Sequence, residues 1–139
     1  MEKREIEAAR WFSQAEEDLK AASSFLEKEG YNWVCFIAQQ AAEKALKAVY
    51  YFRDEGVEWV HSLYILIEGD INRGIKGIPE LKNLLDEARE LDKVYVPTRY
   101  PNGLPYGIPS QFYTKKDGQR CLVIASQIIG ETKKLLPIT

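Results

Sequence analysis

The sequence predicts an all-α protein, an antiparallel up-and-down bundle of four to five helices with a long proline-rich loop before the last helix. Apolar residues recur at spacings of three and four over long stretches, as they do along one face of a helix. Glycine, asparagine and proline fall between these stretches, where helices begin and end. No segment shows the alternation of apolar and polar residues that is typical of a half-buried strand.

The first two expected helices run from Glu2 to Glu29 and from Trp33 to Arg53. Gly30 suits the end of the first, because glycine tolerates the left-handed cap conformation. Asn32 suits the N-cap of the second, where its side chain accepts a backbone N–H. The connection is short, so we expect the two helices to pack antiparallel. Their apolar stripes are Phe12, Ala15, Leu19, Ala22 and Leu26, and Val34, Ile37, Ala41, Ala45, Ala48 and Phe52.

Three further helices are expected, from His61 to Glu68, from Pro79 to Tyr95 and from Thr114 to Leu136. The segment between the last two reads VPTRYPNGLPYGIPS and contains four prolines. Proline lacks a backbone N–H and fixes φ, so we predict a helix-free loop over residues 95–113.

Composition sets limits on function. A chain of 139 residues predicts a single domain spanning 1–139, and 45% apolar with 29% charged residues is typical of a soluble globular protein. The net charge of −2 argues against general polyanion binding, so nucleic-acid contact requires a local basic patch. The charged N-terminus and the lack of a long apolar run predict a cytoplasmic protein.

Cys35 and Cys121 lie far apart in apolar helical contexts, which predicts two reduced, buried thiols. Because no CxxC pair or Cys/His cluster is present, we expect no metal site and no cofactor.

His61 is the first candidate functional residue, since it is the only histidine and its side chain exchanges protons near neutral pH. At a helix N-terminus it would face a partial positive charge that also attracts phosphate. The alternative is a histidine that merely caps the helix beside Ser62.

Lys44 and Lys47 are the second candidates, because they share a helix face with Gln40 and could grip a phosphate. Equally, Glu43 and Lys47 have the favourable i,i+4 order of a solvated ion pair.

Arg99-Tyr100-Pro101, with Tyr106 beyond it, is the third candidate. Arginine binds phosphate in a fork geometry and tyrosine offers a face on which a base stacks. The surrounding charge is locally positive, from Arg99 to Arg120. The alternative is a packed loop whose tyrosines fill the end of the bundle.

Arg53 is the fourth candidate. An arginine and a histidine at one phosphodiester suit a metal-independent ribonuclease, in which His61 moves a proton and Arg53 stabilises developing charge. The alternative is a surface arginine that offsets the helix dipole.

Four sequence features together carry a resemblance to one family. They are Trp11-x6-Asp18-Leu19, the block GYNWVCFIAQQAAEKALKA from Gly30 to Ala48, His61-Ser62-Leu63, and RYP at Arg99 to Pro101. The chain resembles the HEPN (higher eukaryotes and prokaryotes nucleotide-binding) domain family along nearly its whole length.

The resemblance implies a helical bundle that dimerises. It also implies either nucleotide binding or metal-independent ribonuclease activity, often in toxin–antitoxin pairs with a small nucleotidyltransferase partner. Ribonuclease members carry an arginine followed by a histidine after roughly four to six residues. Here seven residues separate Arg53 from His61, and the residue after Arg53 is acidic, so this chain departs from the motif.

These residues and the family resemblance lead to three hypotheses for the function. The leading hypothesis is a homodimeric module that binds a nucleotide or RNA phosphate through Lys44, Lys47, His61, Arg99, Tyr100 and Tyr106, with a nucleotidyltransferase partner. The alternatives are a metal-independent endoribonuclease toxin that uses His61 and Arg53, and a structural dimerisation module without a ligand. The aromatic residues Trp11, Trp33 and Phe36 lie off the main stripes, which favours a homodimer.

Overall fold

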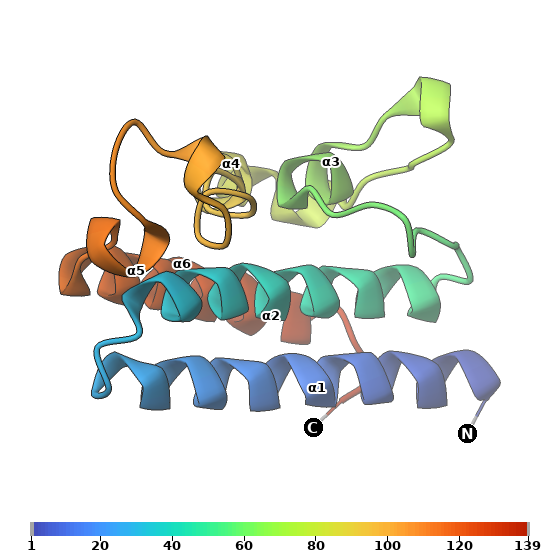
Figure 1. Ribbon diagram of the computed structural model, residues 1–139. Coiled ribbons are helices and arrows are strands. Elements are labelled where there is room, and N and C mark those ends of the chain that lie inside the picture. The colour runs from blue at the N-terminus through green and yellow to red at the C-terminus, as the bar shows by residue number, and fades with distance from the viewer. Residues whose placement is uncertain (1, 139) are drawn as a thin grey trace.

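Long helices dominate the computed structural model, which describes residues 2–138 (Figure 1). Three of them are α1 (Lys3–Leu26), α2 (Tyr31–Phe52) and α6 (Lys115–Lys133). The short elements between α2 and α6 are α3 (Leu63–Glu68), the 3₁₀ turns η1 (Ile71–Arg73) and η2 (Pro79–Leu84), α4 (Leu85–Asp92), η3 (Pro101–Gly103) and α5 (Pro109–Phe112). No strand is formed within residues 2–138, and Asp70 and Ile75 make a single isolated bridge. The all-α prediction is confirmed.

Helix α2 lies at the centre of the molecule. In Figure 1 it runs between α1 below it and the layer of α3 and α4 above it, with α6 behind. The antiparallel α1–α2 hairpin is formed by the short connection around Gly30. Because other elements cover α2 on several sides, its burial extends well beyond the one apolar stripe that the sequence predicts.

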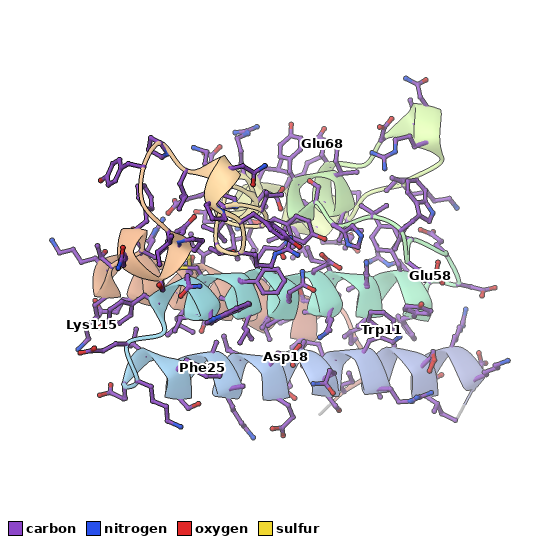
Figure 2. All side chains as sticks on the ribbon, viewed as in Figure 1. Trp11, Asp18, Phe25, Glu58, Glu68 and Lys115 are labelled. Atoms are coloured by element: carbon purple, nitrogen blue, oxygen red, sulfur yellow. The ribbon has the colours of Figure 1, made fainter. Side chains whose placement is uncertain are left out.

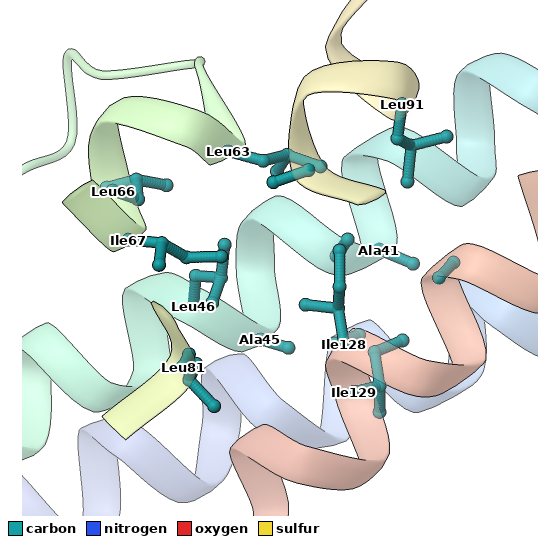
Figure 3. Close-up of a cluster of buried hydrophobic side chains, with 14 of the residues drawn as sticks. Ala41, Ala45, Leu46, Leu63, Leu66, Ile67, Leu81, Leu91, Ile128 and Ile129 are labelled. Atoms are coloured by element: carbon teal, nitrogen blue, oxygen red, sulfur yellow. The ribbon is translucent and has the colours of Figure 1, made fainter. Parts of the chain in front are cut away.

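Small side chains on α2 allow this close packing. Five alanines of α2 are fully buried, and they let neighbouring helices approach without leaving voids. Figure 3 shows Ala41, Ala45 and Leu46 of α2 beneath Leu63, Leu66 and Ile67 of α3, with Ile128 and Ile129 of α6 alongside. The core therefore joins α3 to the long helices. The buried alanines are Ala38, Ala41, Ala42, Ala45 and Ala48.

The predicted N-cap at Asn32 is wrong. Helix α2 begins at Tyr31 with Gly30 in the cap position, so Asn32 lies within the first turn. Its side chain is buried, and Nδ2 donates a hydrogen bond to the carbonyl oxygen of Thr98 at 3.1 Å. Asn32 thus ties α2 to the proline-rich segment, a long-range contact that competes with local capping.

The predicted start of the third helix at His61 is also wrong. Ser62 is the N-cap of α3 and accepts a hydrogen bond from the backbone N–H of Ile65 at 3.1 Å. Asp92 completes the cap, since its carboxylate accepts from Ser62 Oγ at 2.8 Å and from the N–H groups of Leu63 and Tyr64 at 2.8 and 3.0 Å. His61 therefore precedes the helix.

The predicted helix from Pro79 to Tyr95 is divided. Its first part is the 3₁₀ turn η2, and the α-helical part ends at Asp92. An acidic residue at a helix C-terminus opposes the dipole. Here that unfavourable interaction is offset by the hydrogen bonds that Ser62, Leu63 and Tyr64 donate to Asp92. A tertiary contact therefore accompanies the end of α4.

The proline-rich segment 95–113 is partly helical, contrary to the helix-free loop that we predicted. Pro101 begins η3 and Pro109 begins α5. Proline suits this first helical position, because a backbone N–H there would have no partner within the helix. Thr98 is fully buried, and its Oγ1 donates to the carbonyl oxygen of Val94 at 2.6 Å.

A second connection, residues 69–77, projects from the bundle beside α3 (Figure 1). The hydroxyl of the buried Tyr50 donates to the carbonyl oxygen of Leu66 at 2.6 Å and accepts from the N–H of Gly77 at 3.0 Å. Gly77 has a φ of 82°, and a Cβ there would lie 2.8 Å from the Glu68 and Ile67 carbonyl oxygens. The base of this connection is therefore closed tightly.

Cys35 and Cys121 are both buried and not joined by a disulfide, as predicted. The neighbouring Cys121 thiol and burial raise the pKa of the Cys35 thiol above its usual range. Within residues 2–138, no helix combines the length and the apolar character that crossing a bilayer requires.

Candidate functional site

His61 is held on one side and open on the other. Its carbonyl oxygen accepts a hydrogen bond from Gln39 Nε2 at 3.0 Å, and its Nδ1 lies 3.4 Å from Glu43 Oε2. The imidazole stacks on the ring of Tyr95, with the centroids 5.5 Å apart and the planes 15° from parallel. About half of the side chain, 52%, remains exposed. The ring is thus positioned by α2 and by the turn after α4, with one edge available to a ligand.

Beneath His61 lies a buried ion pair. Lys47 Nζ donates to Glu43 Oε2 at 2.9 Å, and the two side chains are only 3% and 7% exposed. Lys47 also donates to the carbonyl oxygen of Glu58 at 3.0 Å, and Gln40 Nε2 lies 3.4 Å from Glu43 Oε1. Lys47 is therefore a buried structural residue, and it does not reach the surface at which we expected it to grip a phosphate.

The segment that carries His61 is anchored along its length. Val57 and Val60 are buried in the core, and Lys47 holds the Glu58 carbonyl oxygen between them. The Glu58 carboxylate accepts from the Tyr51 hydroxyl at 3.0 Å. A hydrogen bond from its own backbone N–H and the Tyr51 hydroxyl lower the pKa of Glu58 below its usual range. The loop is thus fixed to α2 before it reaches His61.

Lys44 faces another part of the molecule. Its Nζ pairs with Asp18 Oδ2 of α1 at 2.5 Å, and it lines a shallow pocket of about 350 Å³ together with Trp11 and Arg10. Figure 2 shows Trp11 and Asp18 between α1 and α2, on the side of α2 away from α3. Lys44 thus turns to α1 whereas Lys47 turns to the segment before α3, so the two lysines do not form the phosphate-binding face that we expected with Gln40.

Arg99 contacts the same aromatic ring as His61, that of Tyr95. Its guanidinium sits over the rings of Phe36 at 4.4 Å, Tyr95 at 4.7 Å and Tyr100 at 5.1 Å. Its Nε and Nη2 donate to the Tyr95 carbonyl oxygen at 3.0 and 2.8 Å. Tyr95 therefore contacts both His61 and Arg99. We call this group the His61–Arg99 cluster: Phe36, His61, Tyr95, Arg99 and Tyr100.

Arg53 lies outside this cluster. It pairs with Glu80 of η2, and this hydrogen-bonded guanidinium holds the pKa of the Glu80 carboxyl below its usual range. Along α2, Arg53 lies ten residues beyond the Glu43 that contacts His61, which corresponds to about 15 Å of helix. Within one chain the structure therefore does not join Arg53 to His61.

Tyr106 also lies outside the cluster. It is 73% exposed, and its ring meets the edge of Phe112 on α5, with centroids 5.3 Å apart.

Three members of the site were missed by sequence reasoning, namely Phe36, Glu43 as a partner of His61, and Tyr95. A signal was present, because Phe36, Gln40 and Glu43 are spaced by four and three and so share one face of α2. Tyr95 lies four residues before Arg99. At this spacing a turn can bring the Arg99 side chain back to the Tyr95 carbonyl oxygen. Across residues 2–138 no group of three or more His, Cys, Asp or Glu side chains is arranged to hold a metal ion.

The HEPN domain model matches residues 8–135, nearly the whole chain. The chain belongs to the HEPN family. This confirms the resemblance carried by the α2 block, the His61 segment and the RYP motif. A relative named “Putative toxin MJ1304”, from Methanocaldococcus jannaschii, is 32% identical over 138 residues, covering 93% of this chain and 88% of the relative.

Solved structures share the HEPN fold. TT1696 of Thermus thermophilus superposes with a TM-score of 0.81 at 35% identity, covering 93% of this chain and 98% of that one. An archaeal HEPN homologue, ST0689, gives a TM-score of 0.73 at 32% identity, with 91% and 95% covered. A HEPN domain protein of Thermotoga maritima gives 0.65 at 34%, with 91% and 96% covered.

The buried pair at the base of the site generates a stability prediction. Lys47→Met leaves the Glu43 carboxylate buried without its cation, so the free energy of unfolding should fall by about 3–5 kcal/mol. Lys44→Met breaks the more exposed pair with Asp18 and should cost clearly less. Urea denaturation of the two variants measures the difference. Equal losses would show that Lys47 does not stabilise the fold in this way.

Proposed function

We propose that this HEPN protein binds the phosphate of a nucleotide or an RNA at the His61–Arg99 cluster. The observation that supports this most directly is the fixed guanidinium of Arg99. Its Nε and Nη2 donate hydrogen bonds to the Tyr95 carbonyl oxygen, and its remaining N–H groups have no hydrogen-bond acceptor among residues 2–138. Arginine held over aromatic rings loses little entropy when it takes up a phosphate.

The surroundings of Arg99 suit a nucleotide better than a free anion. The ring of Tyr100 is 50% exposed, and Trp33, whose ring meets the edge of Phe36 with centroids 6.1 Å apart, is 46% exposed. Exposed aromatic faces beside a cation are the arrangement on which bases stack. We therefore assign the phosphate to Arg99, a neighbouring ligand hydroxyl to His61 and the base to these rings, and Lys44, Lys47 and Tyr106 are left out of the proposed site.

The wider role that we propose is that of a toxin-like protein in the cytoplasm. The likeness to a relative named as a toxin supports this role. The family resemblance adds a small nucleotidyltransferase protein as the partner of a toxin–antitoxin-like pair.

We also propose a homodimer. Large exposed apolar side chains are typical of surfaces that associate. Trp33, Val96 and Tyr100 are each between 44% and 50% exposed, so the dimer interface would adjoin the site and the base would stack between the two copies. At micromolar concentration, analytical ultracentrifugation should give about twice the 16.0 kDa mass of the chain. Sedimentation as a monomer would contradict the dimer, and Trp33→Ala should weaken association more than substitution of the distant Trp59.

Binding to the cluster is tested with Arg99→Gln. A hydrogen bond to a charged group contributes about 1.5–3 kcal/mol, so affinity for nucleotides or short RNA should fall about tenfold or more. The matched control is Arg89→Gln, because Arg89 also lies over a tyrosine ring, that of Tyr64, at 4.7 Å. A thermal-shift titration gives the readout, since a ligand of the folded state raises the melting temperature.

Either of two results would overturn the binding proposal. One is the absence of any shift with nucleotides and short RNAs, which would favour the structural dimerisation module. The other is an equal loss in Arg99→Gln and Arg89→Gln, which would mean that affinity depends on overall charge and not on the cluster.

The contact between Glu43 and His61 favours metal-independent RNA cleavage as a second candidate function. A carboxylate beside an imidazole is a common arrangement in general acid–base catalysis. If the protein cleaves RNA in EDTA, His61→Ala should reduce the rate by about a hundredfold or more. Arg53→Gln should change it little, because Arg53 pairs with Glu80. Cleavage that survives His61→Ala, or is lost in Arg53→Gln alone, would reject this assignment.

A further inference from the structure

We infer that Glu43 is a positioning residue that holds His61 in the Nδ1–H tautomer and turns Nε2 outward as a hydrogen-bond acceptor. The tautomer itself is a property of the free protein. Its use on a ligand rests on the function proposed above. The inference gives the buried Glu43–Lys47 pair a role at the site beyond stability.

The contacts of Glu43 determine which ring nitrogen carries the proton. As the partner of the Lys47 ammonium, Glu43 is a carboxylate, and a carboxylate only accepts hydrogen bonds. The nitrogen that lies 3.4 Å from its Oε2 is Nδ1 of His61. For this contact to be favourable, Nδ1 must carry the hydrogen. In a neutral imidazole the other nitrogen, Nε2, then has a free lone pair.

Two contacts besides Glu43 restrain His61. Gln39 holds the backbone carbonyl oxygen of His61, and Tyr95 stacks on the ring face. Gln40 links Gln39 to Glu43, since its Nε2 lies 2.8 Å from Gln39 Oε1 and 3.4 Å from Glu43 Oε1. Both Gln39 and Glu43 are buried, and hydrogen bonds are stronger away from water.

The 3.4 Å separation is longer than the usual range of about 2.7–3.2 Å for an N–H···O hydrogen bond. Such contacts in free proteins often shorten when a ligand binds. A small movement of the exposed imidazole towards the fixed carboxylate is enough, because Lys47 and the core hold Glu43 in place.

The tautomer decides what His61 can offer to a ligand. Neutral imidazole in water prefers to carry its hydrogen on Nε2, and such a ring would present a donor at the open edge. With the hydrogen on Nδ1, the open edge presents an acceptor, which suits a ligand hydroxyl. Glu43 thereby selects between these two behaviours without itself reaching the ligand, since it is 5% exposed.

The tautomer of His61 can be measured directly, because His61 is the only histidine in the sequence. Labelling with ¹⁵N-histidine gives one ring, and long-range ¹H–¹⁵N correlation shows which nitrogen is protonated. At a pH of about 8.5, where an ordinary imidazole is neutral, we expect the Nδ1–H pattern in the ligand-free protein. The Nε2–H pattern in the wild-type protein would overturn the inference by itself.

A double variant shows whether Glu43 is the cause. Glu43→Leu with Lys47→Met removes both buried charges, so no charge is left unpaired and the net charge is unchanged. The ring nitrogens should then exchange roles, giving the Nε2–H pattern. The matched control removes the neighbouring pair that joins α2 to α1, Asp18→Leu with Lys44→Met, and should keep the wild-type pattern.

The same change of tautomer in both double variants would overturn the assignment to Glu43. If the Glu43/Lys47 variant does not fold, the wild-type spectrum still decides the tautomer. Because these spectra are recorded without a ligand, their outcome is separate from that of the Arg99→Gln titration. Where ligand binding is found, the folded Glu43/Lys47 variant should bind about tenfold more weakly, and unchanged affinity would show that the tautomer has no role in binding.

Discussion

The buried ion pair between Glu43 and Lys47 is the constraint on which the rest of the site depends. Two charges withdrawn from water are tolerated only when each finds partners, and here each charge has one partner in the segment between α2 and α3. Lys47 donates a hydrogen bond to the Glu58 carbonyl oxygen, and the Glu43 carboxylate contacts Nδ1 of His61. The cost of burying the pair is thus offset by contacts that order the connection between α2 and α3.

Helix α2 serves two purposes because its faces differ. Alanines such as Ala41 and Ala45 allow close helix packing, whereas Gln39, Gln40 and Glu43 form a polar face within the same helix. A helix buried on several sides has no solvent to satisfy polar side chains, so each of these must bond to a neighbour. The segment before α3, which carries His61, supplies such partners to Gln39 and Glu43, and Tyr95 of the turn after α4 stacks on His61. The site follows from how α2 is covered.

Local patterns in the sequence were enough to predict the helical class, the long helices and the family. They failed where a distant residue decides the local structure. Asn32 leaves the cap to bond Thr98, and Asp92 ends α4 while capping α3. The candidate site divides in the same way: His61 and Arg99 both contact Tyr95, but only a tertiary fold could reveal that Lys44 pairs with Asp18 and Arg53 with Glu80. One-dimensional spacing does not encode these pairings.

The Tyr50 hydroxyl has a consequence for how this fold can vary. One oxygen atom bonds to the Leu66 carbonyl at one end of the projecting connection and to the Gly77 N–H at the other. The hydrogen bonds of Tyr50 therefore fix only the base of this connection, and Ile71 at its tip is 92% exposed. Residues 71–74, beyond the Asp70–Ile75 bridge, can be lengthened, replaced or given a fluorescent label without disturbing the core. Relatives of this protein are expected to differ most there in length, while the tyrosine and the closure beneath it stay the same.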